Sequence, residues 1–297
     1  MKTRTLAFSL AALITSALPA ASITVSSAAG DVTLEHPPER IAVYDVAALD
    51  TLQAMDIPVG ARVQKVYVDY LTDQQDDAAL VGTLFEPDFE ALHVYDPDLI
   101  IVGARSATKA KDLSRIAPVM ETVFGGQDLV AQVDKSLDTF GIMFDREDRA
   151  QKLKQDLDTR LQSARDAVRD KGTALIVMTN GPKISAYGPN SRFGWLHDEL
   201  GIPAAVPDIA DSSHGEAVSF EYILHANPDW LIVLDRVAAI GQDGQMAQEV
   251  LDNDIVRETQ AWQDGHIVYL DPATLYIATG GYQATSNLLD QITAAFK

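Results

Sequence analysis

Residues 88–105 read DFEALHVYDPDLIIVGAR, and residues 219–236 read SFEYILHANPDWLIVLDR. The two stretches align without gaps, with seven of 18 positions identical. Each copy opens on a good helix N-cap residue, Asp88 or Ser219, and then uses Pro-Asp to leave the helix and start an apolar strand. A helix followed by a buried strand, present twice, predicts two similar α/β lobes.

Short apolar strands alternate with helical patterns on both sides of this repeat. Strands are expected at 41–44, 99–102, 174–178, 231–234 and 267–270. Helices are expected at 46–55, 107–116, 194–200, 220–226 and 247–261. Such alternation is typical of α/β units with mainly parallel sheets.

One long charged helix is expected between the two lobes, over residues 146–171. Its apolar positions recur at steps of three and four residues, at Ala150, Leu153, Leu157, Leu161, Ala164 and Val168. A helix of this length spans roughly 39 Å, which is the reach of a whole domain. The predicted fold class is therefore α/β, with an N-terminal lobe (23–145) and a C-terminal lobe (172–297) joined by one long linking helix, and with a ligand cleft between the lobes.

The first 22 residues have the three parts of a secretory signal peptide. Lys2 and Arg4 precede an apolar run over residues 5–18, and small residues follow up to Ser22. The chain contains no cysteine, which excludes disulfides, thiolate metal sites and a lipidated N-terminal cysteine. We therefore expect export to the periplasm without a lipid anchor. A retained N-terminal anchor helix is the alternative.

The charge balance excludes several classes of partner. The 297 residues include 43 acidic and 23 basic ones, for a formal charge of −20. Nucleic acids and anionic membranes need a basic face, so neither binding to nucleic acid nor direct membrane insertion is expected. The chain is also expected to be a monomer. No nucleophile elbow, P-loop or dinucleotide fingerprint is present, so the chain is not expected to be an enzyme. The enzymatic alternative is a secreted α/β hydrolase that uses Asp211, Ser213 and His214.

Three arginines are the first candidates for ligand binding. Ligands of open α/β sheets bind beyond the carboxyl ends of the strands, which is where Arg105 and Arg236 end the two copies of the repeat. Arg192 lies in the turn-rich loop YGPNSRFG. From residue 172 onward there are only five basic residues against 16 acidic ones. Guanidinium groups in a cleft suit an anionic, oxygen-rich ligand, although a local ion pair, such as Arg236 with Asp235, is the alternative for each of them.

His214 and Tyr276 are the next candidates. Both lie in loops near predicted strand ends, in DSSHGEAVSF and YLDPATLYIATGG. An imidazole and a phenolate together suit the coordination shell of a hard ferric ion, but they are too few to hold a metal alone. A solvated histidine and a tyrosine that covers the core are the alternatives.

These features together resemble the periplasmic substrate-binding proteins of ABC importers, in the rigid helical-backbone class. Within that class the chain is most similar to the group that binds ferric siderophores of the catecholate type. The resemblance rests on ERIAVYDVAALDTLQAMDI, VGTLFEPDFEALHVYDPDLIIVGAR, YGPNSRFGWLHDELGIP, SHGEAVSFEYILHANPDWLIVLDR and VLDNDIVRETQAWQDGHIVYLDP. It implies capture of a ferric siderophore and its delivery to an ABC permease. Haem, cobalamin or a metal ion is the alternative cargo.

The resemblance also implies a role for each candidate in the cleft. Arg105, Arg192 and Arg236 match the positions that face the anionic iron–catecholate centre. His214 and Tyr276 match the positions that ligate iron when the siderophore offers only four donor atoms. No intrinsic cofactor is implied, because the ferric ion travels inside the ligand.

Two glutamates in the repeat match positions that dock on the permease. Glu90 and Glu221 each lie in the first turn of a repeat helix, where the helix dipole favours an acidic side chain. The resemblance implies that they meet basic pockets of the permease at the tips of the two lobes. Release of the ligand is then expected to depend on the permease separating the lobes.

Overall fold

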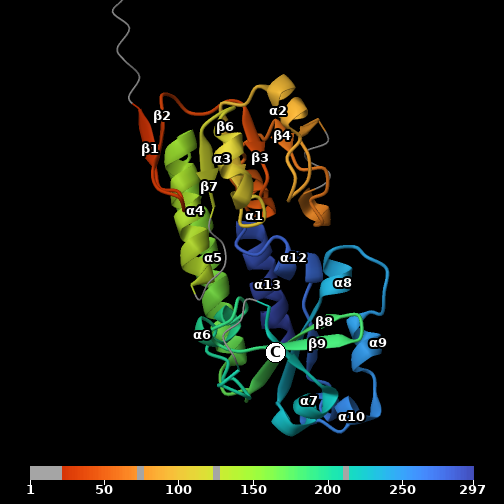
Figure 1. Ribbon diagram of the computed structural model, residues 1–297. Helices are drawn as coiled ribbons and strands as arrows, with labels where there is room; N and C mark the ends of the chain where they lie inside the picture. The colour runs from red at the N-terminus through yellow and green to blue at the C-terminus, as the bar shows by residue number, and fades with distance from the viewer. Residues whose placement is uncertain (1–21, 72–76, 123–127, 210–213) are drawn as a thin grey trace, which may run out of the picture.

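The structure, a computed structural model, describes residues 22–71, 77–122, 128–209 and 214–297. It contains two α/β lobes connected by long helices (Figure 1). The expected signal peptide lies outside the described residues, except for Ser22. Within the described ranges, no helix has both the length and the hydropathy needed to span a bilayer.

The N-terminal lobe is built on a five-stranded sheet whose pairs are all parallel. In sheet order its strands are β5 (Ala79–Leu80), β4 (Ala61–Arg62), β3 (Ile41–Val43), β6 (Leu99–Val102) and β7 (Val119–Glu121). Its helices are α1 (Val46–Ala54), η1 (Asp69–Leu71), α2 (Phe89–Tyr95), η2 (Ala107–Lys109) and α3 (Ala110–Leu113). A separate antiparallel hairpin joins β1 (Ile23–Val25) to β2 (Val32–Leu34).

The C-terminal lobe is built on a mixed five-stranded sheet. In sheet order its strands are β10 (Glu216–Val218), β9 (Lys183–Tyr187), β8 (Ala174–Asn180), β11 (Trp230–Asp235) and β12 (Ile267–Tyr269). Strand β11 pairs in parallel with β8 and β12, whereas β9 and β10 are antiparallel. Its helices are α6 (Trp195–Asp198), α7 (Phe220–Ala226), α8 (Arg236–Ala239), α9 (Ala247–Leu251), α10 (Asp254–Arg257), α11 (Gln260–Gln263) and α12 (Pro272–Tyr276).

The repeated sequence forms the same unit in each lobe, α2–β6 and α7–β11, which confirms the two-lobed prediction. The Asp88 carboxylate accepts a hydrogen bond from the Ala91 amide at 2.9 Å, so it caps α2 as expected. Ser219 caps α7 in the same way. Each helix ends at a residue in the left-handed conformation, Asp96 or Asn227, just before the proline that leads into a fully buried strand.

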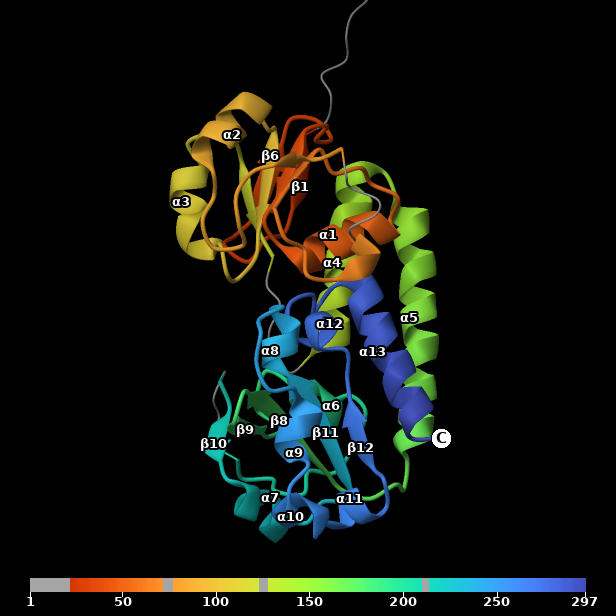
Figure 2. The same ribbon diagram turned by 90° about the vertical axis from the view of Figure 1, so that its right-hand side faces the viewer.

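The linking helix is α5, Glu147–Val168, slightly shorter than predicted. All six residues of its predicted apolar stripe are buried. Two further helices accompany it, α4 (Leu129–Phe144) and α13 (Tyr282–Ala295), and Figure 2 shows α13 lying along α5. The chain therefore returns from the C-terminal lobe to the linking helix before it ends, while the lobe boundaries named above stay a prediction.

Three predicted helices differ from the structure, and one of them, 194–200, forms only the single turn of α6. The segment 247–261 forms three short helices because polar side chains cap new helices within it. The Asn253 side chain accepts the amides of Ile255 and Val256 at 3.1 Å, and the Thr259 hydroxyl accepts the amide of Trp262 at 3.3 Å. The segment 107–116 forms only η2 and the single turn of α3.

A buried carboxylate connects the N-terminal lobe to α13. Asp50 of α1 is 0% exposed, and its side chain accepts hydrogen bonds from the amides of Gln283 (2.7 Å) and Ala284 (2.9 Å) in the first turn of α13. The Tyr70 hydroxyl donates a third hydrogen bond at 2.7 Å. Burial raises the pKa of Asp50 to about 7, although these hydrogen bonds oppose the shift.

Replacing this carboxylate gives a pH-dependent test of the junction. We expect Asp50→Asn to lower the free energy of unfolding by about 1–3 kcal/mol, because an amide nitrogen would then face a backbone donor. The raised pKa means that the folded state holds a proton that the unfolded state releases between about pH 4 and 7, so the wild-type stability falls as pH rises through this window. Asp50→Asn should therefore lower the free energy of unfolding by a larger amount at pH 5 than at pH 8.

Urea unfolding of both proteins at several pH values measures this difference, with the exposed Asp252→Asn as the control. If the decrease in the free energy of unfolding caused by Asp50→Asn grows as pH rises, Asp50 stabilises the fold as an ionised carboxylate instead.

Candidate functional site

A cavity of about 1110 Å³ lies between the two lobes. Strands β8 and β9 and helices α8 and α12 supply its wall in the C-terminal lobe. The N-terminal lobe supplies six lining residues, Asp45, Tyr67, Leu84, Phe85, Ala104 and Arg105. The cavity is at the upper end of the size range of small-molecule sites, so it suits a large ligand.

The three predicted arginines meet around Tyr276, the last residue of α12. The guanidinium carbons of Arg105, Arg192 and Arg236 lie 5.7, 4.8 and 5.7 Å from the centre of the Tyr276 ring. Each comes from a different part of the chain, the turn after β6, the loop before α6 and the start of α8. The structure thus brings one arginine of the N-terminal lobe together with two of the C-terminal lobe.

Neutral oxygens hold these guanidinium groups in place. The Tyr276 carbonyl accepts a hydrogen bond from Arg105 at 2.7 Å and another from Arg192 at 3.4 Å. Arg236 donates through Nε to the Tyr276 hydroxyl at 3.2 Å and through Nη1 to the Asn180 side chain at 3.1 Å. Within the described part of the chain, no carboxylate forms an ion pair with any of the three, so their positive charge is available to an anionic ligand.

Burial changes the electrostatics of charged groups that line the cavity. Burial lowers the pKa of Arg192, and the neighbouring charge of Arg105 lowers it further. Burial raises the pKa of Asp45, which accepts a hydrogen bond from the Thr122 hydroxyl at 2.7 Å. An anion placed among the arginines would relieve their mutual repulsion, which is strong in a partly buried site.

His214 also lines the cavity and is exposed. Its backbone carbonyl accepts a hydrogen bond from the Tyr187 hydroxyl at 2.9 Å, which ties the His214 loop to β9. Burial raises the pKa of Tyr187 to about 12, so this hydroxyl remains a donor at neutral pH. Asp211 and Ser213, which the hydrolase alternative needs, lie outside the described residues.

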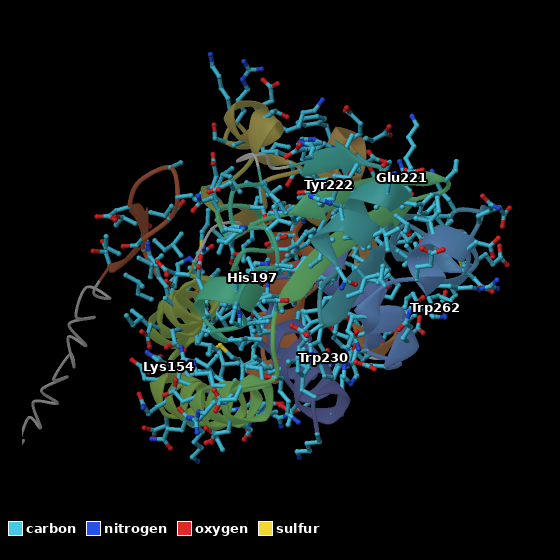
Figure 3. The ribbon with its side chains drawn as sticks, turned by 90° about the horizontal axis from the view of Figure 1, so that it is seen from below. Lys154, His197, Glu221, Tyr222, Trp230 and Trp262 are labelled. Atoms are coloured by element: carbon cyan, nitrogen blue, oxygen red, sulfur yellow. The ribbon has the colours of Figure 1, made fainter. Side chains whose placement is uncertain are left out.

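The two repeat glutamates lie away from the cavity. Glu90 is exposed on α2 and Glu221 is exposed on α7, at opposite ends of the molecule in Figure 1. Figure 3 shows Glu221 and Tyr222 close together, and Figure 1 shows that α7, which carries both, lies at the lower end of the C-terminal lobe. This placement is compatible with contact to a partner that reaches both lobes at once.

The sequence did not single out several lining residues. Asn180, which holds Arg236, and Tyr187, which holds the His214 loop, both lie on the β8–β9 hairpin. The alternating pattern KISAY at 183–187 was a signal for a strand with one polar face. Which face lines the cavity depends on pairing with β8, and the sequence alone does not show that pairing.

Two α/β lobes on a helical connection, with a large cationic cavity between them, define a solute-binding protein. The chain belongs to the periplasmic binding protein family, whose model matches residues 41–274. Among curated relatives, it is 37% identical over 262 residues to the petrobactin-binding protein YclQ of Bacillus subtilis, covering 86% of this chain and 81% of YclQ. It is 26% identical to the ferric-anguibactin-binding protein FatB of Vibrio anguillarum, covering 93% and 88%.

Solved structures show the same fold. The crystal structure of YclQ superposes with a TM-score of 0.87 at 33% identity, covering 93% of this chain and 99% of that one. The periplasmic catecholate-siderophore binding protein VctP of Vibrio cholerae superposes with a TM-score of 0.85 at 32% identity, covering 92% and 100%. The predicted family and fold class are therefore confirmed.

Proposed function

We propose that the chain captures a ferric siderophore of the catecholate type in the periplasm and delivers it to an ABC permease of the inner membrane. The observation that carries this proposal is the convergence of three guanidinium groups on Tyr276, held by neutral oxygens. A ferric tris-catecholate has three negative charges, which the three arginines would balance in a partly desolvated cavity. The relatives named for petrobactin, anguibactin and catecholate siderophores support the same cargo class.

Direct iron ligation is the second part of the proposal. A bis-catecholate leaves two coordination positions of ferric iron open, and His214 and Tyr276 both line the cavity. Their nitrogen and oxygen donors would fill those positions and select ferric iron over softer metals. We assign the iron to the ligand as cargo, with no resident cofactor and no catalytic step.

Docking on the permease involves the two exposed glutamates. Glu90 and Glu221 present carboxylates at opposite ends of the molecule, so each lobe carries one contact. A permease with matching basic pockets would hold both lobes and separate them, which opens the cavity between them. The protein acts as an unanchored monomer after the signal peptide is removed.

Arg236→Ala tests the electrostatic part of the site. We expect it to weaken binding of a ferric tris-catecholate by about 10-fold or more, because a charge-assisted hydrogen bond is worth about 1.5–3 kcal/mol. Tryptophan fluorescence quenching measures the affinity, and Arg257→Ala, which removes an arginine paired with Asp252 instead, is the control. If the wild type binds no ferric catecholate tighter than about micromolar and binds haem or cobalamin instead, the cargo assignment is wrong.

Tyr276→Phe tests the iron ligand separately from the arginines. The variant removes only the phenol oxygen. It keeps the main-chain carbonyl of residue 276, which accepts hydrogen bonds from Arg105 and Arg192. We expect binding of a ferric bis-catecholate to fall at least about 10-fold and its visible spectrum to shift, since a metal ligand is lost. Binding of a hexadentate tris-catecholate should change less than about threefold. Equal losses for both complexes would mean that Tyr276 acts through Arg236 and not through iron.

The double variant Glu90→Gln, Glu221→Gln tests docking. Both side chains are exposed and outside the cavity lining, so ligand affinity should stay within about twofold of wild type. Iron uptake by cells that carry the variant should fall, because each lobe loses its charged contact with the permease. Glu258→Gln, at another exposed position, is the control. Normal uptake by the double variant would contradict the docking assignment.

A further inference from the structure

Strand β9 turns a fourth cationic side chain toward the cavity. Side chains alternate between the two faces of a strand, and Lys183, Ser185 and Tyr187 all line the cavity. Ile184 and Ala186 point the other way, into the apolar core of the C-terminal lobe. The register of β9 with β8 thus fixes the direction of Lys183, since Asn180 pairs with Lys183 and Val177 pairs with Ala186.

No carboxylate on the neighbouring strand faces Lys183. Strand β10 places Ala217 opposite Ser185, on the cavity side, whereas Glu216 lies opposite Ala186, on the other side. Among the described residues, Lys183 takes part in none of the ion pairs. Across residues 22–71, 77–122, 128–209 and 214–297, its ammonium group thus has no acidic ion-pair partner.

Basic residues in the C-terminal lobe are concentrated at this cavity. From residue 172 onward the chain has five bases against 16 acids, and Lys183, Arg192 and Arg236 all line the cavity. Of the other two, Arg257 forms ion pairs with acidic neighbours and Lys297 is the last residue. A lysine at this position of an otherwise acidic lobe is thus part of a cationic surface that the ligand meets.

Lys183 is more exposed than the three arginines. Arg105, Arg192 and Arg236 are half-buried around Tyr276, whereas Lys183 is exposed and lies at the start of β9. Asn180 contacts both Arg236 and Lys183. Its side-chain oxygen accepts a hydrogen bond from Arg236, and its backbone pairs with Lys183 across the β8–β9 hairpin. Lys183 and Ser185 line the same cavity as the arginines, so a ligand whose iron centre lies among the arginines could contact them with another part of its structure.

We propose that Lys183, with Ser185 beside it, forms a subsite for a carboxylate that belongs to the ligand backbone and lies outside the iron coordination shell. The inference rests on the proposed function and narrows its cargo to ferric catecholates whose backbone carries a free carboxylate. The ammonium group supplies the charge and the hydroxyl supplies a second donor. A catecholate complex with a neutral backbone would leave Lys183 without a counter-charge.

Two ferric complexes that differ by one charge test this subsite. The first is the iron complex of N2,N6-bis(2,3-dihydroxybenzoyl)lysine, whose backbone ends in a carboxylate, and the second is the complex of its primary carboxamide. Both present the same four catecholate oxygens to iron. We expect the wild type to prefer the carboxylate form by about fivefold, as measured by fluorescence quenching at low salt.

The variants isolate the contribution of Lys183. Lys183→Gln should bind the two ferric complexes about equally, because only its affinity for the carboxylate complex falls. Lys183→Arg should keep the preference for the carboxylate complex. Lys152→Gln removes an exposed lysine from the outer face of α5 and should leave the preference unchanged. Because Lys183 is exposed, circular dichroism should show both position-183 variants folded.

The possible failures separate the two proposals. Equal wild-type affinity for the two complexes, or an equal loss for both in Lys183→Gln, would overturn the carboxylate subsite and leave the cargo class standing. Failure of the wild type to bind either complex, together with failure to bind a tris-catecholate, would overturn the proposed function itself.

Discussion

One buried side chain, the Asp50 carboxylate, joins the N-terminal lobe to the C-terminal helix. It accepts two backbone amides at the start of α13 and the Tyr70 hydroxyl, and so fixes the C-terminal helix to the N-terminal lobe. Helix α12 lies five residues before α13, and its last residue, Tyr276, accepts a hydrogen bond from Arg105 of the N-terminal lobe. The Asp50 junction and the Arg105 contact therefore both connect the last part of the chain to the N-terminal lobe, one of them at the cavity itself.

The charge distribution reconciles an acidic protein with an anionic cargo. The net charge of −20 describes the whole chain, whereas Arg105, Arg192, Arg236 and Lys183 all line one cavity. Short-range attraction inside the cavity is screened little, whereas the field of the outer surface decays within about 10 Å in salt. The acidic exterior thus favours solubility, while a ligand inside the cavity meets mainly the charges that line it.

The sequence predicted those features whose signals are local. The caps at Asp88 and Ser219, the apolar strands and the stripe of α5 follow from short patterns, and the repeat placed Arg105 and Arg236 at equivalent strand ends. The hydrogen bond between Asp50 and Gln283 joins residues 233 positions apart, so no pattern within a short stretch of sequence predicts it. The break-up of 247–261 was also missed, because apolar spacing alone does not show that a polar side chain will start a new helix.

The main-chain carbonyl of Tyr276 has a consequence for how such a site changes in evolution. Two of the three guanidinium groups are held by this carbonyl, which every amino acid provides, and not by the side chain at the same position. A different side chain at position 276 would therefore leave the acceptor for two of the arginines in place. If the proposed iron ligation by Tyr276 holds, charge attraction and metal selectivity are separable traits of one scaffold, and a designer is able to alter the second without rebuilding the first.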